Sequence, residues 1–289
     1  MTAPHRLTDA QVRDFIRYTD TRRWPLLGRF PVGEELHSEL LAQMLGSSRD
    51  TVRSIVGEFA SRARRTAEEM LADRRFRDSI RALPFGPGDR VVGVGDSVTA
   101  DRLGWFELLS AAAALGGRSA GDMVNLGVSG NTTADVLERF DLLEEARPSH
   151  VLLMLGTNDA RSHGRAVAYR MVSAAETERN FRALVDLIVT GLGAGVTVIT
   201  PPAVDQRRID TSFAEAAVGW RADDVAEVAG IARKVAPAGI DLHGLTSDHV
   251  GGDFLEADGV HPTPAGQRLI LTRVVAHLAE RPATIGRRR

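Results

Sequence analysis

The chain has 289 residues, of which 43% are hydrophobic, and its formal net charge at pH 7 is -2. This near-neutral balance gives no overall reason to expect binding to nucleic acid or to an anionic membrane surface. The chain has no cysteine, which excludes disulfides, a thiolate nucleophile and metal sites with cysteine ligands. No apolar run approaches the ~20 residues of a membrane span, and no apolar core follows the first basic residues. We therefore expect no membrane partner and no signal peptide, and we predict a cytoplasmic protein.

The first 85 residues show helical patterns and no convincing strand. We predict helices at residues 8–19, 34–45, 49–71 and 73–83. The cluster Pro84-Phe85-Gly86-Pro87-Gly88 would break a helix and marks a domain boundary. We therefore divide the chain into a helical N-terminal extension, residues 1–85, and a second domain, residues 86–289. We expect the extension to cap the second domain or to form the interface of a homodimer.

Residues 40–53 of this extension also resemble a helix-turn-helix. Ala42, Gly46 and Val52 have spacings that allow two helices to pack closely, and the second helix would present Arg49 and Arg53 to DNA. A short helical hairpin with a Gly-Ser turn explains the same pattern without DNA. Because the chain is slightly acidic, we keep DNA binding as a remote alternative and expect no nucleic-acid partner.

From residue 86 onward, short apolar strands alternate with helical patterns. This alternation is typical of parallel βαβ units whose helices cover both faces of a sheet. It predicts an α/β fold, a three-layer α/β/α sandwich with a five-stranded parallel sheet. In such sheets, ligands bind at the carboxyl ends of the strands. The expected strands are 90–94, 123–126, 150–155, 196–200 and 239–242, and the expected helices are 103–115, 132–145, 176–190, 213–235 and 264–280.

A serine follows the first expected strand after a glycine turn. Gly95 allows a tight turn, and Ser97 would then project from the carboxyl edge of the sheet as a nucleophile. Taken alone, Ser97 is better explained as the cap of the next helix. A dinucleotide-binding loop would need a third glycine after Gly93 and Gly95, but position 98 is Val.

The segment Asp258-Gly259-Val260-His261 precedes the last expected helix. His261 can serve as the base that a serine nucleophile needs, and Asp258 can orient its ring across a turn. A surface loop with no special role remains an alternative explanation. A metal site is a weaker one, because the nearby His and Asp residues lack a recognisable ligand spacing. We expect no metal and no cofactor.

Two further segments offer hydrogen-bond donors to a negatively charged oxygen. In Asn125-Leu126-Gly127 the Gly127 N–H could serve, and in Gly156-Thr157-Asn158-Asp159 the Asn158 amide could serve. Ordinary turns between a strand and a helix would also account for both segments.

Together and in this order, the four segments resemble those of the GDSL-type esterases, also called the SGNH hydrolases. Ser97, Gly127, Asn158 and His261 stand at the four signature positions, and the resemblance covers about residues 90–280. It implies a flavodoxin-like sandwich, a catalytic triad of Ser97, His261 and Asp258, and an oxyanion hole formed by Ser97, Gly127 and Asn158. One departure is Val98, where the name-giving motif has leucine.

The resemblance implies a serine hydrolase that cleaves a small-molecule carboxylic ester through an acyl-enzyme. The alternative is an acyltransferase, because the same triad serves both reactions and only the acceptor differs. Arg207 and Arg208 lie in an irregular segment and could bind an anionic group of the substrate. Unpaired surface arginines are the other explanation for this pair.

Overall fold

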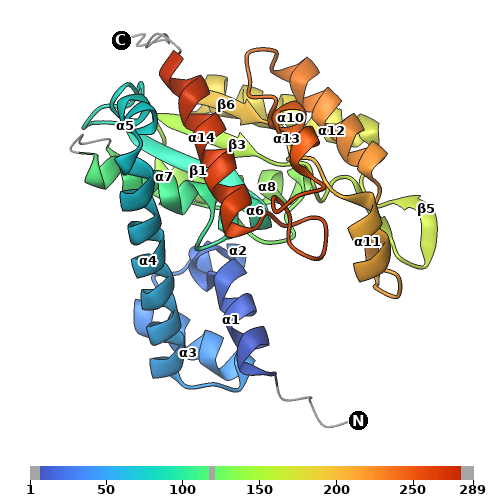
Figure 1. Ribbon diagram of the computed structural model, residues 1–289, viewed down its shortest axis with the longest axis horizontal. Helices are drawn as coiled ribbons and strands as arrows, with labels where there is room; N and C mark the ends of the chain where they lie inside the picture. Colours follow the sequence, from blue (N-terminus) through green and yellow to red (C-terminus); the bar gives the residue numbers. More distant parts are fainter. Residues whose placement is uncertain (1–6, 117–120, 281–289) are drawn as a thin grey trace.

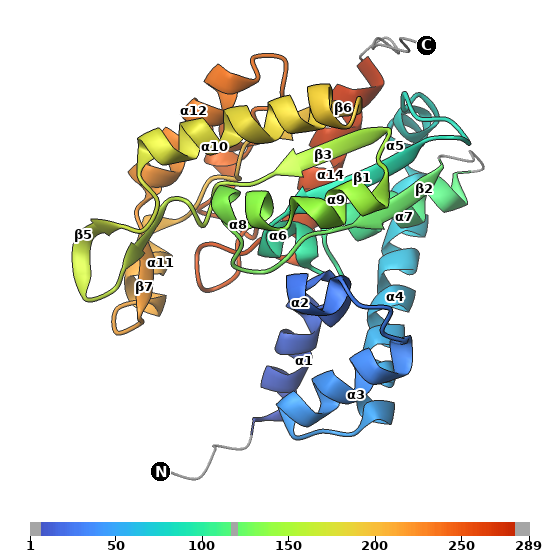
Figure 2. The same ribbon diagram turned by 180° about the vertical axis from the view of Figure 1, so that it is seen from behind.

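The computed structural model describes residues 7–116 and 121–280. Its centre is a parallel sheet of four strands in the order β2-β1-β3-β6, shown in Figures 1 and 2. The strands are β1 (Arg90–Gly95), β2 (Asp122–Asn125), β3 (His150–Met154) and β6 (Gly195–Ile199). β1 and β3 are almost wholly buried, as expected for parallel strands that are covered on both faces.

Helices cover both faces of this sheet, and each layer forms its own apolar core. On one side lie α5 (Arg74–Arg81), α7 (Trp105–Leu115), α13 (Leu242–Thr246) and α14 (Pro264–Glu280). On the other side lie α8 (Thr133–Glu138), α9 (Phe140–Ala146), α10 (Ala174–Asp186) and α12 (Ala222–Val235). A short π-helix, Leu187–Gly191, continues α10. The predicted three-layer α/β/α sandwich is confirmed.

The predicted fifth strand at residues 239–242 is wrong in extent. Only Ile240 pairs with Ile199, in a single parallel bridge. The chain then turns at once into α13, because the side chain of Asp241 caps that helix by accepting a hydrogen bond from the Gly244 N–H at 3.1 Å.

A second, antiparallel sheet was not predicted. It consists of β4 (Arg161–His163), β5 (Ala166–Arg170) and β7 (Val218–Trp220), in the order β5-β4-β7. β7 replaces the start of the helix expected at 213–235. The segment expected to be irregular before it contains α11 (Gln206–Ser212). The helix expected at 132–145 is divided into α8 and α9 at Arg139.

The N-terminal helices extend away from the sandwich, below the sheet in Figure 1. They are α1 (Asp9–Tyr18), a 3-10 turn at Thr21–Arg23, α2 (Pro25–Gly28), α3 (Glu34–Leu45) and α4 (Arg49–Ala72). α3 ends at Gly46 in the left-handed conformation, with φ of 60°, and Ser48 caps α4. The predicted helical character of this region is therefore confirmed, and its role stays a prediction.

α4 belongs to two cores. Val52, Ile55 and Phe59 in its first half pack with buried residues of α1 and α3. Ala63 and Ala67 in its second half pack with α5, α7 and α14. Within residues 7–116 and 121–280, no helix combines the length and the apolar character needed to cross a bilayer.

Candidate active site

Ser97 is the first residue of a four-residue helix, α6 (Ser97–Ala100), that follows β1 directly. Asp96 caps α6 by accepting a backbone hydrogen bond from its first turn at 3.0 Å. The turn requires Gly95, because a Cβ there would collide with the side chain of Thr99 and the carbonyl of Met154. The hydroxyl of Ser97 is thereby placed at the carboxyl end of β1, one of the two inner strands.

The structure brings Ser97, His261 and Asp258 together although 164 positions separate the serine from the histidine. Nε2 of His261 lies 3.0 Å from Oγ of Ser97, and Nδ1 of His261 lies 2.6 Å from Oδ2 of Asp258. The other oxygen of Asp258 accepts the backbone N–H groups of Val260 and His261 at 2.9 and 3.0 Å. These bonds fix the carboxylate, and the carboxylate orients the ring.

The electrostatics of this cluster favour a charged pair. Burial lowers the pKa of His261, but the hydrogen bond and the charge of Asp258 outweigh it, so the pKa is raised above the ordinary 6.5. Burial acts to raise the pKa of Asp258, and the hydrogen bond from His261 reverses this, so its pKa is lowered. Asp96 differs: its burial raises its pKa to about 6.

Asn158 follows β3 and faces the same edge of the sheet. Its Nδ2 donates to the carbonyl of Asn131 at 3.1 Å, which leaves its second N–H for another acceptor. The next residue, Asp159, is fully buried and accepts the N–H and the hydroxyl of Thr133 at 3.0 and 2.5 Å. Asp159 thus fixes the Asn158 turn to the start of α8.

The geometry of Gly127 differs from the expectation that its N–H is offered to an oxyanion. Its N–H donates to Oδ1 of Asn125 at 2.8 Å and is therefore directed at a protein acceptor. Gly130 lies three residues further along, beside Asn131, in the left-handed region with φ of 83°. Among the described residues, no acceptor takes a hydrogen bond from the Gly130 N–H, and the space around its Cα is open.

A buried arginine supports this loop from beneath. Nε of Arg139 donates to Oδ1 of Asn131 at 2.6 Å, and an Nη donates to the carbonyl of Leu126 at 2.9 Å. Burial lowers the pKa of Arg139 to about 10. Arg139 could not be recognised from the sequence as a site residue, because it lies in the middle of a segment with a helical pattern.

Arg207 and Arg208 occupy different surroundings on α11. The guanidinium of Arg208 donates to the carbonyls of Leu255 and Gly252 at 2.6 and 2.8 Å, and so supports the loop that leads to His261. Arg207 is exposed. Arg208 therefore already has acceptors within the protein, which gives it a structural explanation.

Most of the sandwich matches a known protein family. Residues 94–269 match the GDSL-like Lipase/Acylhydrolase family. The chain belongs to this family. The matched part of the GDSL-like chain begins within β1 and includes Ser97, Asn158 and His261, whereas α1 to α5 lie outside it.

Solved structures of similar fold cover about two thirds of the GDSL-like chain. One is an α/β hydrolase enzyme from the metagenome of Lake Arreo, Spain, with a TM-score of 0.54 and 24% identity, covering 68% of this chain and 97% of its own. Another is an acetylxylan esterase from Geobacillus stearothermophilus, with a TM-score of 0.53 and 20% identity, covering 71% and 100%. No match was found among curated proteins.

Proposed function

We propose that this chain is a serine esterase that hydrolyses a carboxylic ester through an acyl-enzyme. The observation that carries the proposal is the continuous line of hydrogen-bonded atoms from Ser97 Oγ through His261 to Asp258, with distances of 3.0 and 2.6 Å. This arrangement places a base beside a hydroxyl and a carboxylate behind the base, as nucleophilic acyl transfer requires.

In the first step, Nε2 of His261 takes the hydroxyl proton while Oγ of Ser97 bonds to the ester carbonyl carbon. The carbonyl becomes an oxyanion, and Asp258 stabilises the imidazolium. His261 then gives its proton to the alcohol oxygen, the C–O bond breaks, and the alcohol leaves. A water molecule, activated by the same His261, releases the acid and restores Ser97.

Three donors would stabilise the oxyanion in this mechanism. We assign two of them to the Ser97 N–H and the second N–H of the Asn158 amide. For the third, the internal bond from Gly127 to Asn125 favours the Gly130 N–H instead of the Gly127 N–H. Loss of one such donor typically costs about 10²–10³-fold in kcat.

We propose a short acyl group, such as acetyl, as the first to test. Structural neighbours include proteins described as acetyl xylan esterases, and the sheet of this chain shares their fold. The acyltransferase alternative uses the same residues and differs only in the acceptor. Adding alcohols to the assay and measuring the ester product separates the two reactions.

The test is hydrolysis of p-nitrophenyl esters, from acetyl to long chains, by the wild type and by Ser97→Ala. Ser97→Ala should fold normally and lose turnover by at least about 10³-fold, as expected when a nucleophile is removed from a triad. Turnover retained by a folded Ser97→Ala protein would remove Ser97 from the mechanism.

A further inference from the structure

The end of α1 reaches the candidate active site. The ring of Tyr18, the last residue of α1, lies 5.1 Å from the imidazole of His261 between ring centroids, with the two planes inclined by 48°. Tyr18 lies outside the part of the chain that matches the family, which begins at residue 94. The aromatic neighbour of the histidine therefore comes from the N-terminal helices.

Charged contacts hold this end of α1 against both segments of the triad. Arg17 donates to the two carboxylate oxygens of Asp101 at 2.8 and 2.7 Å, and Asp101 directly follows α6 with its Ser97. A further Nη of Arg17 lies 3.3 Å from Glu256, which precedes Asp258 by two residues. Arg17 therefore ties α1 to the serine segment and to the histidine loop at once.

Hydrogen bonds from Arg102 complete this attachment. The N–H of Arg102 donates to the carbonyl of Arg17 at 3.0 Å, and its guanidinium donates to the carbonyls of Ile16 and Thr19 at 3.0 and 3.1 Å. These three bonds satisfy carbonyl groups at the end of α1, which have no partner within the helix. The position of Tyr18 is thus set by the segment that follows Ser97.

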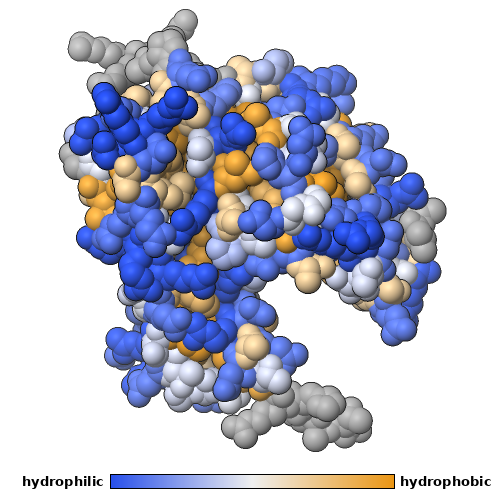
Figure 3. Space-filling model, in the orientation of Figure 1, coloured by the Kyte–Doolittle hydropathy of each residue, from blue (hydrophilic) through white to orange (hydrophobic). Residues whose placement is uncertain are grey.

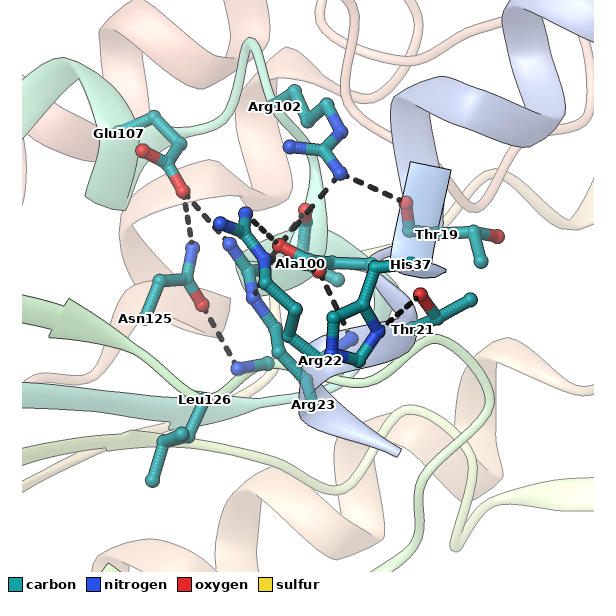
Figure 4. Close-up of polar contacts among 12 residues, drawn as sticks. Thr19, Thr21, Arg22, Arg23, His37, Ala100, Arg102, Glu107, Asn125 and Leu126 are labelled. Carbon is teal, nitrogen blue, oxygen red and sulfur yellow. Dashed lines mark hydrogen bonds and ion pairs between the residues drawn. The ribbon is translucent and has the colours of Figure 1, made fainter. Parts of the chain in front are cut away.

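The same region also reaches the loop that carries Gly127, as Figure 4 shows. Arg23 lies 3.1 Å from Glu107, and the same oxygen of Glu107 accepts the Asn125 amide at 2.9 Å. Asn125 in turn accepts the Gly127 N–H. Arg17 therefore contacts the serine segment and the histidine loop, Tyr18 contacts His261, and Arg23 reaches the Gly127 segment through Glu107.

We infer that Tyr18 is a positioning residue, whose ring holds the imidazole of His261 in the orientation that faces Ser97 and Asp258 together. The inference rests on the esterase function proposed above. The imidazole must direct one nitrogen at Ser97 and the other at Asp258 at the same time. The side-chain torsion that turns the ring has only a broad and shallow preference, so it does not fix this orientation by itself. A ring packed on one face restricts that rotation and shields the face from water.

The tyrosine acts through its ring and not through its hydroxyl. No hydrogen bond from the Tyr18 hydroxyl is formed within residues 7–116 and 121–280. Burial raises the pKa of Tyr18, so the hydroxyl stays neutral at physiological pH. The charged groups that act on His261 are Asp258 in its own loop, Asp96 in the turn after β1, and Asp101 after α6.

Figure 3 shows the surface of the molecule in the orientation of Figure 1. The outline is hollowed between the N-terminal helices and the part that carries α11 and β5, as comparison with Figure 1 shows. In that view α6 and the start of α14 lie above the hollow.

The experiment compares Tyr18→Ala, Tyr18→Phe and Tyr169→Ala. Tyr169 is the chain's other tyrosine and is 65% exposed on β5, so it controls for loss of a tyrosine. We measure kcat and KM for p-nitrophenyl acetate across pH, together with the thermal midpoint. Tyr18→Ala should lower kcat by about 10–100-fold, the cost of a misplaced catalytic group. Tyr18→Phe should stay within about threefold of the wild type, and Tyr169→Ala should match it.

Two results would overturn the inference while leaving the esterase intact. One is a folded Tyr18→Ala protein with wild-type kcat at every pH. The other is a Tyr18→Phe protein as impaired as Tyr18→Ala, because that would assign the effect to the hydroxyl. A fall in kcat that only follows a lowered thermal midpoint in all three variants would also count against it.

If the wild type shows no Ser97-dependent turnover, the proposed function fails and a different readout decides. Histidine NMR, with the His261 signals assigned by loss in His261→Gln, reports the state of the imidazole directly. Tyr18→Ala should shift or broaden these signals, whereas Tyr18→Phe should leave them near their wild-type positions. Identical His261 signals in Tyr18→Ala and the wild type would overturn the inference.

Discussion

Arg17 and Asp101 form a two-pronged ion pair, with hydrogen bonds of 2.8 and 2.7 Å, between the first helix and the segment after Ser97. The Asp101 side chain is fully buried, and that of Arg17 is 12% exposed. Asp101 also accepts the N–H of Leu103 and the amide of Gln267. Because both side chains are largely buried, removal of one charge would leave the other without a compensating partner.

Replacing Arg17 with Met should destabilise the protein by roughly 3–5 kcal/mol, the usual cost of leaving one partner of a buried ion pair uncompensated. Urea denaturation measures the change in the free energy of unfolding. Arg17→Met combined with Asp101→Asn should recover much of the loss, because no unpaired charge remains. If Arg17→Met alone has wild-type stability, the pair contributes no net stability.

The pH dependence of hydrolysis should follow His261. Since its pKa is raised above 6.5 and the neutral form is the base, activity should fall as pH decreases through a value above 6.5. Asp258→Ala removes the group that raises this pKa. It should move the acid limb of the kcat/KM profile to lower pH and reduce kcat by roughly 10²–10⁴-fold. An acid limb that does not move in Asp258→Ala would show that another group controls it.

Asp96 should make the wild type less stable as pH rises. Its pKa is about 6 in the folded protein against an ordinary 3.8, so between these values the folded protein holds a proton that the unfolded chain has released. The free energy of unfolding should therefore fall across this window, by on the order of 3 kcal/mol. Asp96→Asn cannot release a proton, so its stability relative to the wild type should increase from pH 4 to pH 7.

Denaturant unfolding at several pH values tests this dependence. The exposed Asp14 provides the control, because Asp14→Asn removes a solvated carboxyl group of the same type. A difference between Asp96→Asn and the wild type that is constant with pH would contradict the raised pKa.

Arg139 should matter for turnover although it lies beneath the site. Arg139→Met keeps an apolar stem of similar length but removes the bonds to Asn131 and Leu126, which hold the loop of Gly130. We expect kcat to fall by about 10–100-fold, because the reaction slows when an oxyanion donor is displaced by ~1 Å. Arg29→Met is a suitable control, because Arg29 is an exposed arginine that pairs with Asp141 on α9. Equal kcat in the two variants would remove Arg139 from the site.

Much of the fold could be predicted from local patterns. The helix at 34–45 ends where expected because a left-handed Gly46 closes it, and the last helix begins where expected because Pro264 opens it. Ser97, Asp258 and His261 could be proposed as a triad because the segments that carry them, in this order, resemble those of the GDSL-type esterases.

The remaining features depend on contacts that no local pattern contains. β4 pairs with β7 across 57 positions between Ser162 and Gly219, and both strands have only three residues. Gly127 and Gly130 lie in one short segment, and only the bond to Asn125 tells their N–H groups apart. The contact between Tyr18 and His261 could not be predicted, because the two residues lie 243 positions apart and meet only in the tertiary structure.

The packing of α4 in two cores has a consequence for how the protein unfolds. One continuous helix contributes Phe59 to the core of the N-terminal helices and Ala67 to the core of the sandwich. A helix that loses its packing at one end exposes apolar surface and loses support at the other, so the two cores should melt in a single cooperative transition. The segment between residues 49 and 72 therefore joins the two cores: a protein cut before residue 86 would lose α1 to α5, and with them the residues of α4 and α5 that cover α7 and α14.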